Sequence, residues 1–154
     1  MGRPESGHAL IMEKHYLTPL FLPESIAVFA GPKDSTEPRF AQAQAVSAAL
    51  RAQRFAGQLV FIDIHTTGTL ADLAQTRADL AIIALPPEDV IQALEVAGRI
   101  KCRAALVVGS GVTPERAADM HRVAKRHGMH MLGPNSLGMQ RPRAGLNASV
   151  VGPL

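Results

Sequence analysis

Short apolar runs alternate with helix-forming segments along most of the chain, and this alternation strongly restricts the fold. The runs SIAVF at 25–29, DLAIIAL at 79–85 and AALVV at 104–108 are apolar at nearly every position, so both faces of each strand are expected to be buried. Strands of this kind occur in parallel sheets that helices cover on both sides. With right-handed crossovers, the order predicts an α/β fold with a doubly wound, mostly parallel Rossmann-like sheet and helices on both faces.

The remaining elements follow from helix formers, caps and turn residues. Further strands are predicted at 58–64 and 129–132, a sharp turn at 133–135, and weaker strands at 137–140 and 146–151. Helices are predicted at 40–55, 70–75 and 87–100, and another beginning at Pro114 under a Thr113 cap and ending at Gly128. The first helix has an apolar stripe of Phe40, Ala43, Val46 and Leu50, and we expect Gly57 to close it.

Length and composition fit one globular domain. The chain has 154 residues, of which 47% are hydrophobic and 19% charged, so it resembles a folded protein rather than a disordered one. The net charge of +3 is mild and no long Lys/Arg run exists, so we expect no nucleic-acid partner. The basic segment 121–127 is interpreted as a solvated helix face. No apolar run is long enough to predict a membrane span.

The single cysteine, Cys102, can form neither an internal disulfide nor a cysteine-based zinc site. We therefore expect a reducing, cytoplasmic location, with Cys102 as a small residue at a strand start rather than a nucleophile. The histidines lack metal-ligand spacing, so no metal site is expected. Residues 1–14 are expected to be disordered or added in cloning, and residues 15–154 to form one domain truncated from a larger multidomain protein.

A ligand is expected at the carboxyl ends of the strands, where open parallel sheets bind their ligands. The loops there are 30–35, 64–69, 85–88 and 109–112, and their Gly, Pro and small polar residues allow backbone N–H groups to approach a phosphate. Lys33 is either a phosphate partner or an ordinary exposed lysine. Gly109-Ser110-Gly111 either presents its amides to a ligand or forms a simple turn before the next helix.

A nicotinamide dinucleotide is the less favoured ligand. The first loop reads AGPKDS, with one glycine instead of G-x-G-x-x-G, and Pro32 has no N–H to donate. Asp63 ends the second strand, where a ribose-binding acid would stand, but it lies further from Gly31 than the usual spacing of about 20 residues. An NAD-binding oxidoreductase domain therefore stays open as an alternative, as does a purely structural Asp63.

The motif LGPNSLG at 132–138, followed by GLNAS at 145–149, resembles the NDP-forming acyl-CoA synthetase superfamily, which includes the succinyl-CoA synthetase alpha subunit. The similarity runs from His15 over nearly the whole chain, with further matches at 16–21 and 79–84. It implies a CoA-binding domain with CoA or acetyl-CoA as cofactor, its pyrophosphate at the first loop and its adenosine near the loops after strands two and three. The implied cofactor-binding residues are Ala30, Gly31, Pro32, Lys33, Ser35, Ile64, His65, Leu85, Pro86, Pro87, Gly109, Ser110 and Gly111.

The resemblance leaves the parent protein open. Ser136 stands where the synthetases often carry Cys, and in this the turn resembles bacterial protein lysine acetyltransferases fused to a GNAT domain. In either parent the resemblance places the catalytic residues outside this chain. Expected partners are a CoA thioester and the parent's remaining domains, with a homo-oligomer as an option and no membrane partner. Asn135 is expected to be structural, bonding the turn backbone through its side chain.

Two departures from the family pattern fall on phosphate-side loops. The first loop is Ala-Gly-Pro at 30–32 in place of Gly-Ala-Ser, and Ile64-His65 stands in place of Asn-Pro. Whether the altered first loop still binds CoA therefore stays open. A degenerate domain without ligand, kept as a scaffold or for oligomer contacts, is the second hypothesis.

Overall fold

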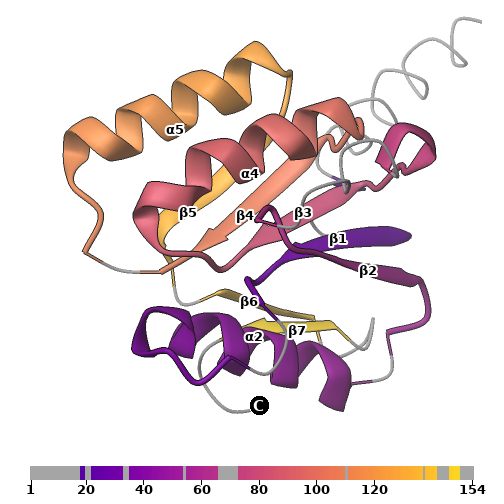
Figure 1. Ribbon diagram of the computed structural model, residues 1–154. Coiled ribbons are helices and arrows are strands. Elements are labelled where there is room, and N and C mark those ends of the chain that lie inside the picture. The colour runs from indigo at the N-terminus through magenta and orange to yellow at the C-terminus, as the bar shows by residue number, and fades with distance from the viewer. Residues whose placement is uncertain are drawn as a thin grey trace, which may run out of the picture.

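The computed structural model describes residues 18–19, 22–32, 35–53, 55–65, 73–109, 111–136, 138–141 and 146–149. Within them, five parallel strands form one sheet in the order β2-β1-β3-β4-β5 (Figure 1). These strands are β1 (Ser25–Phe29), β2 (Gln58–Ile62), β3 (Leu80–Ile83), β4 (Ala104–Val108) and β5 (His130–Ser136). The sheet confirms the predicted doubly wound α/β class. The expectation for residues 1–14 falls outside the described residues.

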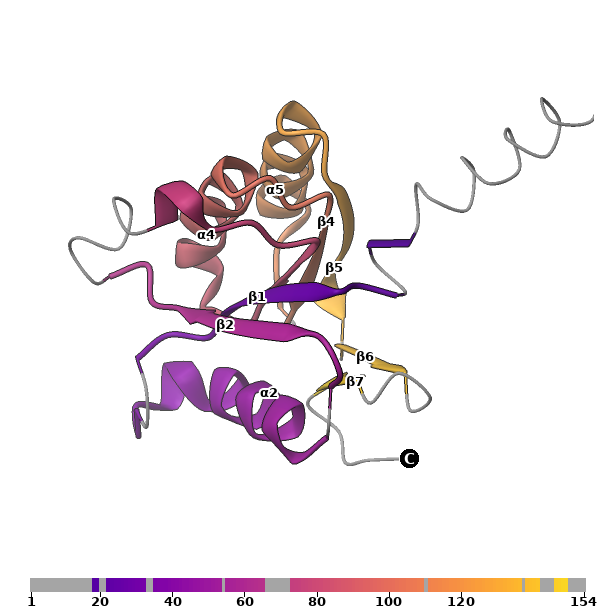
Figure 2. The same ribbon diagram turned by 90° about the vertical axis from the view of Figure 1, so that its right-hand side faces the viewer.

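Helices cover both faces of the sheet. Helix α2 (Ala41–Ala52) lies on one face, and α4 (Pro87–Arg99) and α5 (Pro114–Arg126) lie on the other (Figures 1 and 2). A separate antiparallel hairpin of β6 (Gly138–Arg141) and β7 (Leu146–Ser149) lies beside α2. The 3₁₀ helices η1 and η2 span Pro38–Phe40 and Leu73–Gln75. Along the described parts of the chain, no helix combines the length and the apolar content that crossing a bilayer requires.

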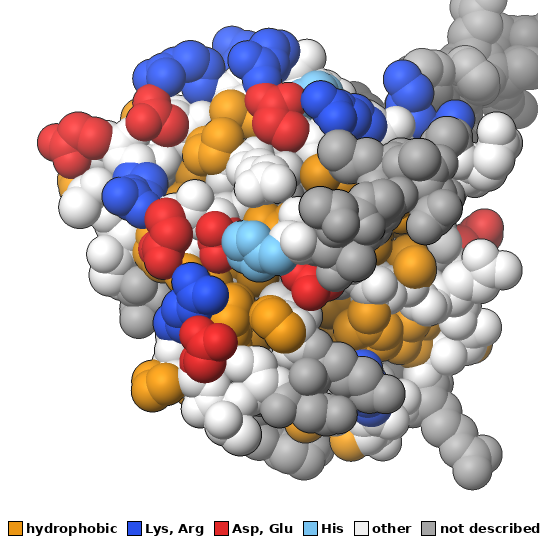
Figure 3. All heavy atoms as spheres, viewed as in Figure 1, with side chains coloured by type: hydrophobic (Ala, Val, Ile, Leu, Met, Phe, Trp, Pro, Cys, Tyr) orange, Lys and Arg blue, Asp and Glu red, His pale blue; other side chains and the backbone are white. Residues whose placement is uncertain are grey.

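The core forms where the sequence pattern places it. Strands β3 and β4 are buried along their whole length, as expected of strands covered on both faces. The predicted apolar stripe is at most 1% exposed at each position, at Phe40 just before α2 and at Ala43, Val46 and Leu50 on α2. The opposite helix layer is solvated on its outside, where Figure 3 shows acidic and basic side chains interspersed over α4 and α5.

Several element ends differ from the prediction because tertiary contacts set them. Helix α2 ends at Ala52, and Gln53 is already extended, so Gly57 does not cap it. Gly57 instead passes so close to β1 that a Cβ there would lie 2.1 Å from the Glu24 carbonyl oxygen. Strands β2 and β3 stop at Ile62 and Ile83 because both pair with Phe29, the last residue of β1.

The sequence predicts that the fifth strand ends at Leu132, before a turn at 133–135, and this prediction is wrong. Strand β5 continues through it to Ser136, and Gly109 N–H donates to the Ser136 carbonyl at 2.9 Å. The extra residues are absorbed by a register shift against β4 between Leu106 and Val108. Residues 133–135 therefore form a bulge within the sheet, at its carboxyl edge.

The basic segment 121–127 at the end of α5 is largely exposed, in agreement with its interpretation as a solvated helix face, but two of its residues bond to α4. Glu95 of α4 accepts hydrogen bonds from Arg126 and from His127 Nε2, the latter at 2.8 Å. Burial lowers the pKa of His127, and the nearby cations Arg126, Arg99 and Lys101 lower it further. The neutral ring can still donate its Nε2–H to Glu95.

Cys102 is buried just before β4, which agrees with its interpretation as a small core residue. Burial raises the pKa of its thiol to about 12 from an ordinary value of 9.0, and the Asp79 carboxylate adds to the rise. The unfolded chain therefore loses the Cys102 proton at lower pH than the folded chain. The stabilisation is complete below about pH 9 and is lost as pH rises toward about 12.

We expect Cys102→Ala to remove this dependence. Wild type should lose about 1 kcal/mol more stability than the variant between about pH 8 and pH 10. Urea unfolding midpoints at the two pH values measure it, and because other titrating groups are common to both proteins, they cancel in the comparison. Equal losses in the two proteins would contradict the burial of an un-ionised thiol.

Candidate functional site

The order of strands reverses between β1 and β3, because the chain builds β2 on one side of β1 and then continues on the other side. One cavity opens on each side of this reversal, at the carboxyl ends of the strands. The α2 pocket, of about 290 Å³, is lined by Val28, Ala30, Gly31, Pro32, Gln44, Ser47, Arg51, Phe61, Ile62 and Asp63. The β4 pocket, of about 270 Å³, is lined by Arg39, Gln42, Ala84, Leu85, Pro86, Pro87, Glu88, Val90, Val107, Val108, Gly109, Val112 and Pro134.

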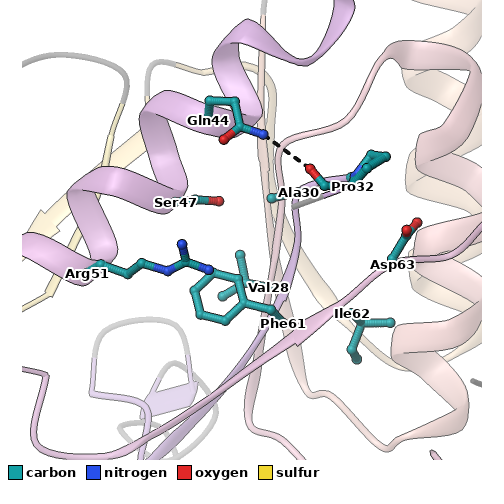
Figure 4. A pocket seen from close by; sticks show the side chains of 10 residues that line it. Val28, Ala30, Pro32, Gln44, Ser47, Arg51, Phe61, Ile62 and Asp63 are labelled. Carbon is teal, nitrogen blue, oxygen red and sulfur yellow. Dashed lines mark hydrogen bonds between the residues drawn. The ribbon is translucent and has the colours of Figure 1, made fainter. Parts of the chain in front are cut away.

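The first loop is held down against α2. Gly31 has a left-handed φ of +76°, and a Cβ there would lie 2.7 Å from the Phe40 ring, so the backbone lies directly on that ring. Gln44 Nε2 donates to the Pro32 carbonyl oxygen at 3.3 Å (Figure 4). Gly31 and Pro32 are thus held by a buried ring below and by a helix side chain beside them, and the small residues at 30–32 leave the backbone open to a ligand.

The α2 pocket carries charges of both signs. In Figure 4 the Asp63 carboxylate and the Arg51 guanidinium lie at opposite ends of the pocket, with the Phe61 ring between them. Arg51 Cζ lies 4.4 Å from the centroid of the Phe61 ring, which is a cation–π contact. Ser47 adds a hydroxyl from the facing helix. Such a pocket suits a ligand that has both hydroxyl and anionic groups.

The β4 pocket has mainly aliphatic and proline walls. The bulge in β5 shapes one of them, because Pro134 lines the pocket and the next residue, Asn135, is bonded to the loop after β4. Asn135 Oδ1 accepts from Val112 N–H at 3.0 Å, and Asn135 Nδ2 donates to the Val112 carbonyl at 3.3 Å. Asn135 is therefore structural as expected, although it bonds a neighbouring loop rather than its own turn.

Seven of the predicted site residues line the two cavities. Ala30, Gly31 and Pro32 line the α2 pocket, and Leu85, Pro86, Pro87 and Gly109 line the β4 pocket. Lys33 and Ser110 lie outside the described residues.

Four predicted residues line neither cavity. Ser35 accepts from Glu37 N–H within its own loop, and Gly111 is next to Val112, which lines the β4 pocket, but does not line it itself. Ile64 and His65 face α4 instead: His65 Nε2 lies 3.3 Å from Asp89 Oδ2, and Gln92 Nε2 donates to the Ile64 carbonyl at 3.5 Å. Ile64 and His65 are therefore docked on α4, at the same edge of the sheet but outside the cavities.

Sequence reasoning missed the residues that regular elements contribute to the α2 pocket. Gln44, Ser47 and Arg51 stand at spacings of three and four on α2, so a polar stripe beside the apolar one was the available signal. Phe61 had no such signal, because only the position of β2 at the sheet edge leaves it 38% exposed. Within the described residues, no three His, Cys, Asp or Glu side chains group as a metal site would require.

Comparisons with known proteins point to a ligand-binding family. A family model described as a CoA binding domain matches residues 48–142. The chain is 36% identical over 79 residues to ADP-forming acetate–CoA ligase I of Archaeoglobus fulgidus, covering 47% of this chain and 12% of the ligase. It is 25% identical over 147 residues to ADP-forming acetate–CoA ligase II of the same organism, covering 86% of this chain and 21% of the ligase.

Solved structures show the same architecture. The dinucleotide-forming acetyl-coenzyme A synthetase 1 of Candidatus Korarchaeum cryptofilum, in complex with phosphate and ADP, matches with a TM-score of 0.74 at 26% identity, over 89% of this chain and 31% of that one. PH0766 of Pyrococcus horikoshii has a TM-score of 0.73 at 21% identity over 88% of this chain and 33% of its own, a likeness of fold alone. This chain therefore spans a third or less of each of these proteins.

Proposed function

The chain belongs to the CoA-binding domain family, and from this premise we propose that it binds CoA or a CoA thioester across the carboxyl edge of its sheet. The family match confirms the resemblance drawn from the LGPNSLG motif as far as a CoA-binding domain, since that motif lies inside the matched residues. The observation that carries the proposal is the pair of unlike cavities on either side of the strand-order reversal.

The two cavities suit the two ends of CoA. The nucleotide end is polar and anionic, and the α2 pocket offers Arg51, Asp63 and Ser47. The pantetheine arm is largely uncharged, and the β4 pocket offers proline and valine walls. The first loop at 30–32 is placed to receive the pyrophosphate, because its small residues let backbone N–H groups approach phosphate oxygens.

We propose that this chain binds and orients the cofactor while other parts of a longer parent perform the chemistry. The similar ADP-forming acetate–CoA ligases favour a ligase as the parent, and the sensing region of a protein lysine acetyltransferase is the second candidate, favoured by Ser136. The buried free thiol of Cys102 favours a reducing compartment, for which we propose the cytoplasm.

Calorimetric titration tests the binding proposal. CoA and acetyl-CoA are expected to bind with dissociation constants between micromolar and millimolar, about −8 to −4 kcal/mol, and to raise the melting temperature as ligand is added. Because every Rossmann-like sheet presents a similar edge, NADH serves as the control ligand. Protection by NADH alone would assign an oxidoreductase domain, and silence with all three ligands together with concentration-dependent light scattering would assign a scaffold.

A further inference from the structure

Arg51 and Phe61 form a contact that neither the loop-based site nor the core accounts for. Arg51 comes from the last turn of α2, and its guanidinium lies over the ring of Phe61 on the edge strand β2 (Figure 4). A cation–π contact attracts the guanidinium through its charge and involves no carboxylate. The contact therefore places the cation over the ring without pairing its charge with an acid.

The electrostatics of the α2 pocket favour an anion at this end. Among the ion pairs of the described residues, none joins Arg51 to a carboxylate. The acid of the pocket, Asp63, lies at the far end and accepts the His65 backbone N–H at 3.0 Å, which turns it toward its own loop. The pocket thus separates an acceptor for hydroxyl groups from a donor for anions, with an aromatic ring between them.

We propose that Arg51 binds the 3′-phosphate of CoA, that Phe61 positions it, and that the pair selects CoA over dephospho-CoA. This inference rests on the proposed function. The nucleotide end of CoA carries a phosphate monoester, and Arg51 brings a positive charge to the lining of this pocket. A planar guanidinium can donate two parallel hydrogen bonds to such a phosphate.

The expected selectivity is about tenfold. A bidentate contact between two charged groups is among the stronger hydrogen-bonded interactions, but this pocket opens to solvent, which screens the attraction. Wild type is therefore expected to bind CoA about tenfold more tightly than dephospho-CoA at low salt, and the preference should shrink as salt is added.

Titration of wild type and three variants with CoA and dephospho-CoA tests the inference. Arg51→Met should weaken CoA binding about tenfold and leave dephospho-CoA binding unchanged, because the aliphatic stem is kept and only the charge is lost. Phe61→Leu should reduce the preference in part, since the cation stays but its support is lost. The control is Arg122→Met, because Arg122 is an exposed arginine of α5 that pairs with Asp119 at 2.7 Å and lines neither cavity. This control should keep the full preference.

The outcomes separate this inference from the proposed function. If wild type binds CoA and dephospho-CoA equally well, or if Arg51→Met keeps the preference, CoA binding stands and the role of Arg51 is overturned. If wild type binds neither compound, both proposals fail. NADPH and NADH form a further pair of probes, and a preference for NADPH over CoA would assign the phosphate contact to a different nucleotide and overturn the inference.

Discussion

Gly133→Ala is expected to lower the free energy of unfolding by about 4 kcal/mol. Gly133 begins the bulge in β5 with a φ of +94°, a conformation that costs a residue with a side chain about 1–3 kcal/mol. A Cβ there would also lie 2.2 Å from the Val107 carbonyl oxygen in the neighbouring strand, so β4 and β5 must separate locally, at about another 1–3 kcal/mol. Native domains are stable by only about 5–15 kcal/mol, so the loss is a large fraction of the total.

Gly111→Ala is the matched control for this substitution. Gly111 has a similar left-handed φ of +75°, but in the part of the chain that the structure describes nothing beyond its own chain neighbours lies within 4 Å of the position that its Cβ would take. It should therefore lose only about 1 kcal/mol, from backbone strain alone. Urea unfolding curves of the two variants measure the difference, and losses of equal size would mean that the close approach of β5 to β4 is not what requires glycine at 133.

The bulge also shows where sequence patterns stop being informative. Gly, Pro and Asn in succession are typical of a turn. Gly133 and Asn135 do have the positive φ values that a turn requires, +94° and +63°. Whether such a segment ends a strand or bulges within it depends on what the neighbouring strand offers for pairing. Here Val108 and Gly109 pair with Ser136 beyond the bulge, and no local pattern contains that information.

Strands β1 and β4 match their predicted ranges, whereas β3, although buried throughout, is three residues shorter than predicted. Strand β4 was predicted to the residue, because a fully buried strand needs apolar side chains on both faces and its composition alone marks it. The edge strand β2 was predicted two residues too long, because its end is set by the length of β1 and not by its own hydrophobicity. The residues at which a strand ends therefore depend on the neighbouring strand it pairs with, whereas the burial of a strand can be predicted from its own sequence.

The candidate site divides in the same way. The topological rule for parallel sheets selects every loop at the carboxyl edge, so it includes residues that line the cavities at 30–32, 85–87 and 109 but also Ile64 and His65, which do not. It did not locate Arg51 or Phe61, because their meeting depends on how α2 lies over the sheet edge. Candidate site residues on loops can be inferred from the topology of the sheet. Those on helices and strands can be inferred only when the way these elements pack against one another is known.

Phe40→Ala is expected both to destabilise the fold by about 3–5 kcal/mol and to weaken CoA binding about tenfold. The Phe40 side chain is completely buried, so its loss leaves a cavity in the core. That cavity lies directly under Gly31, whose backbone rests on the ring, so the first loop loses the support that holds it in place for a ligand. Phe40→Leu keeps much of the buried volume and should lose less in both measurements.

Val46→Ala separates the two effects, because Val46 is also completely buried on α2 but does not line either cavity. It should cost about 2 kcal/mol of stability and leave the dissociation constant for CoA unchanged. Urea unfolding measures stability, and CoA titration at a temperature where every variant remains folded measures binding. If Val46→Ala weakens CoA binding as much as Phe40→Ala does, then general loosening of the α2 layer, and not the ring under Gly31, controls the first loop.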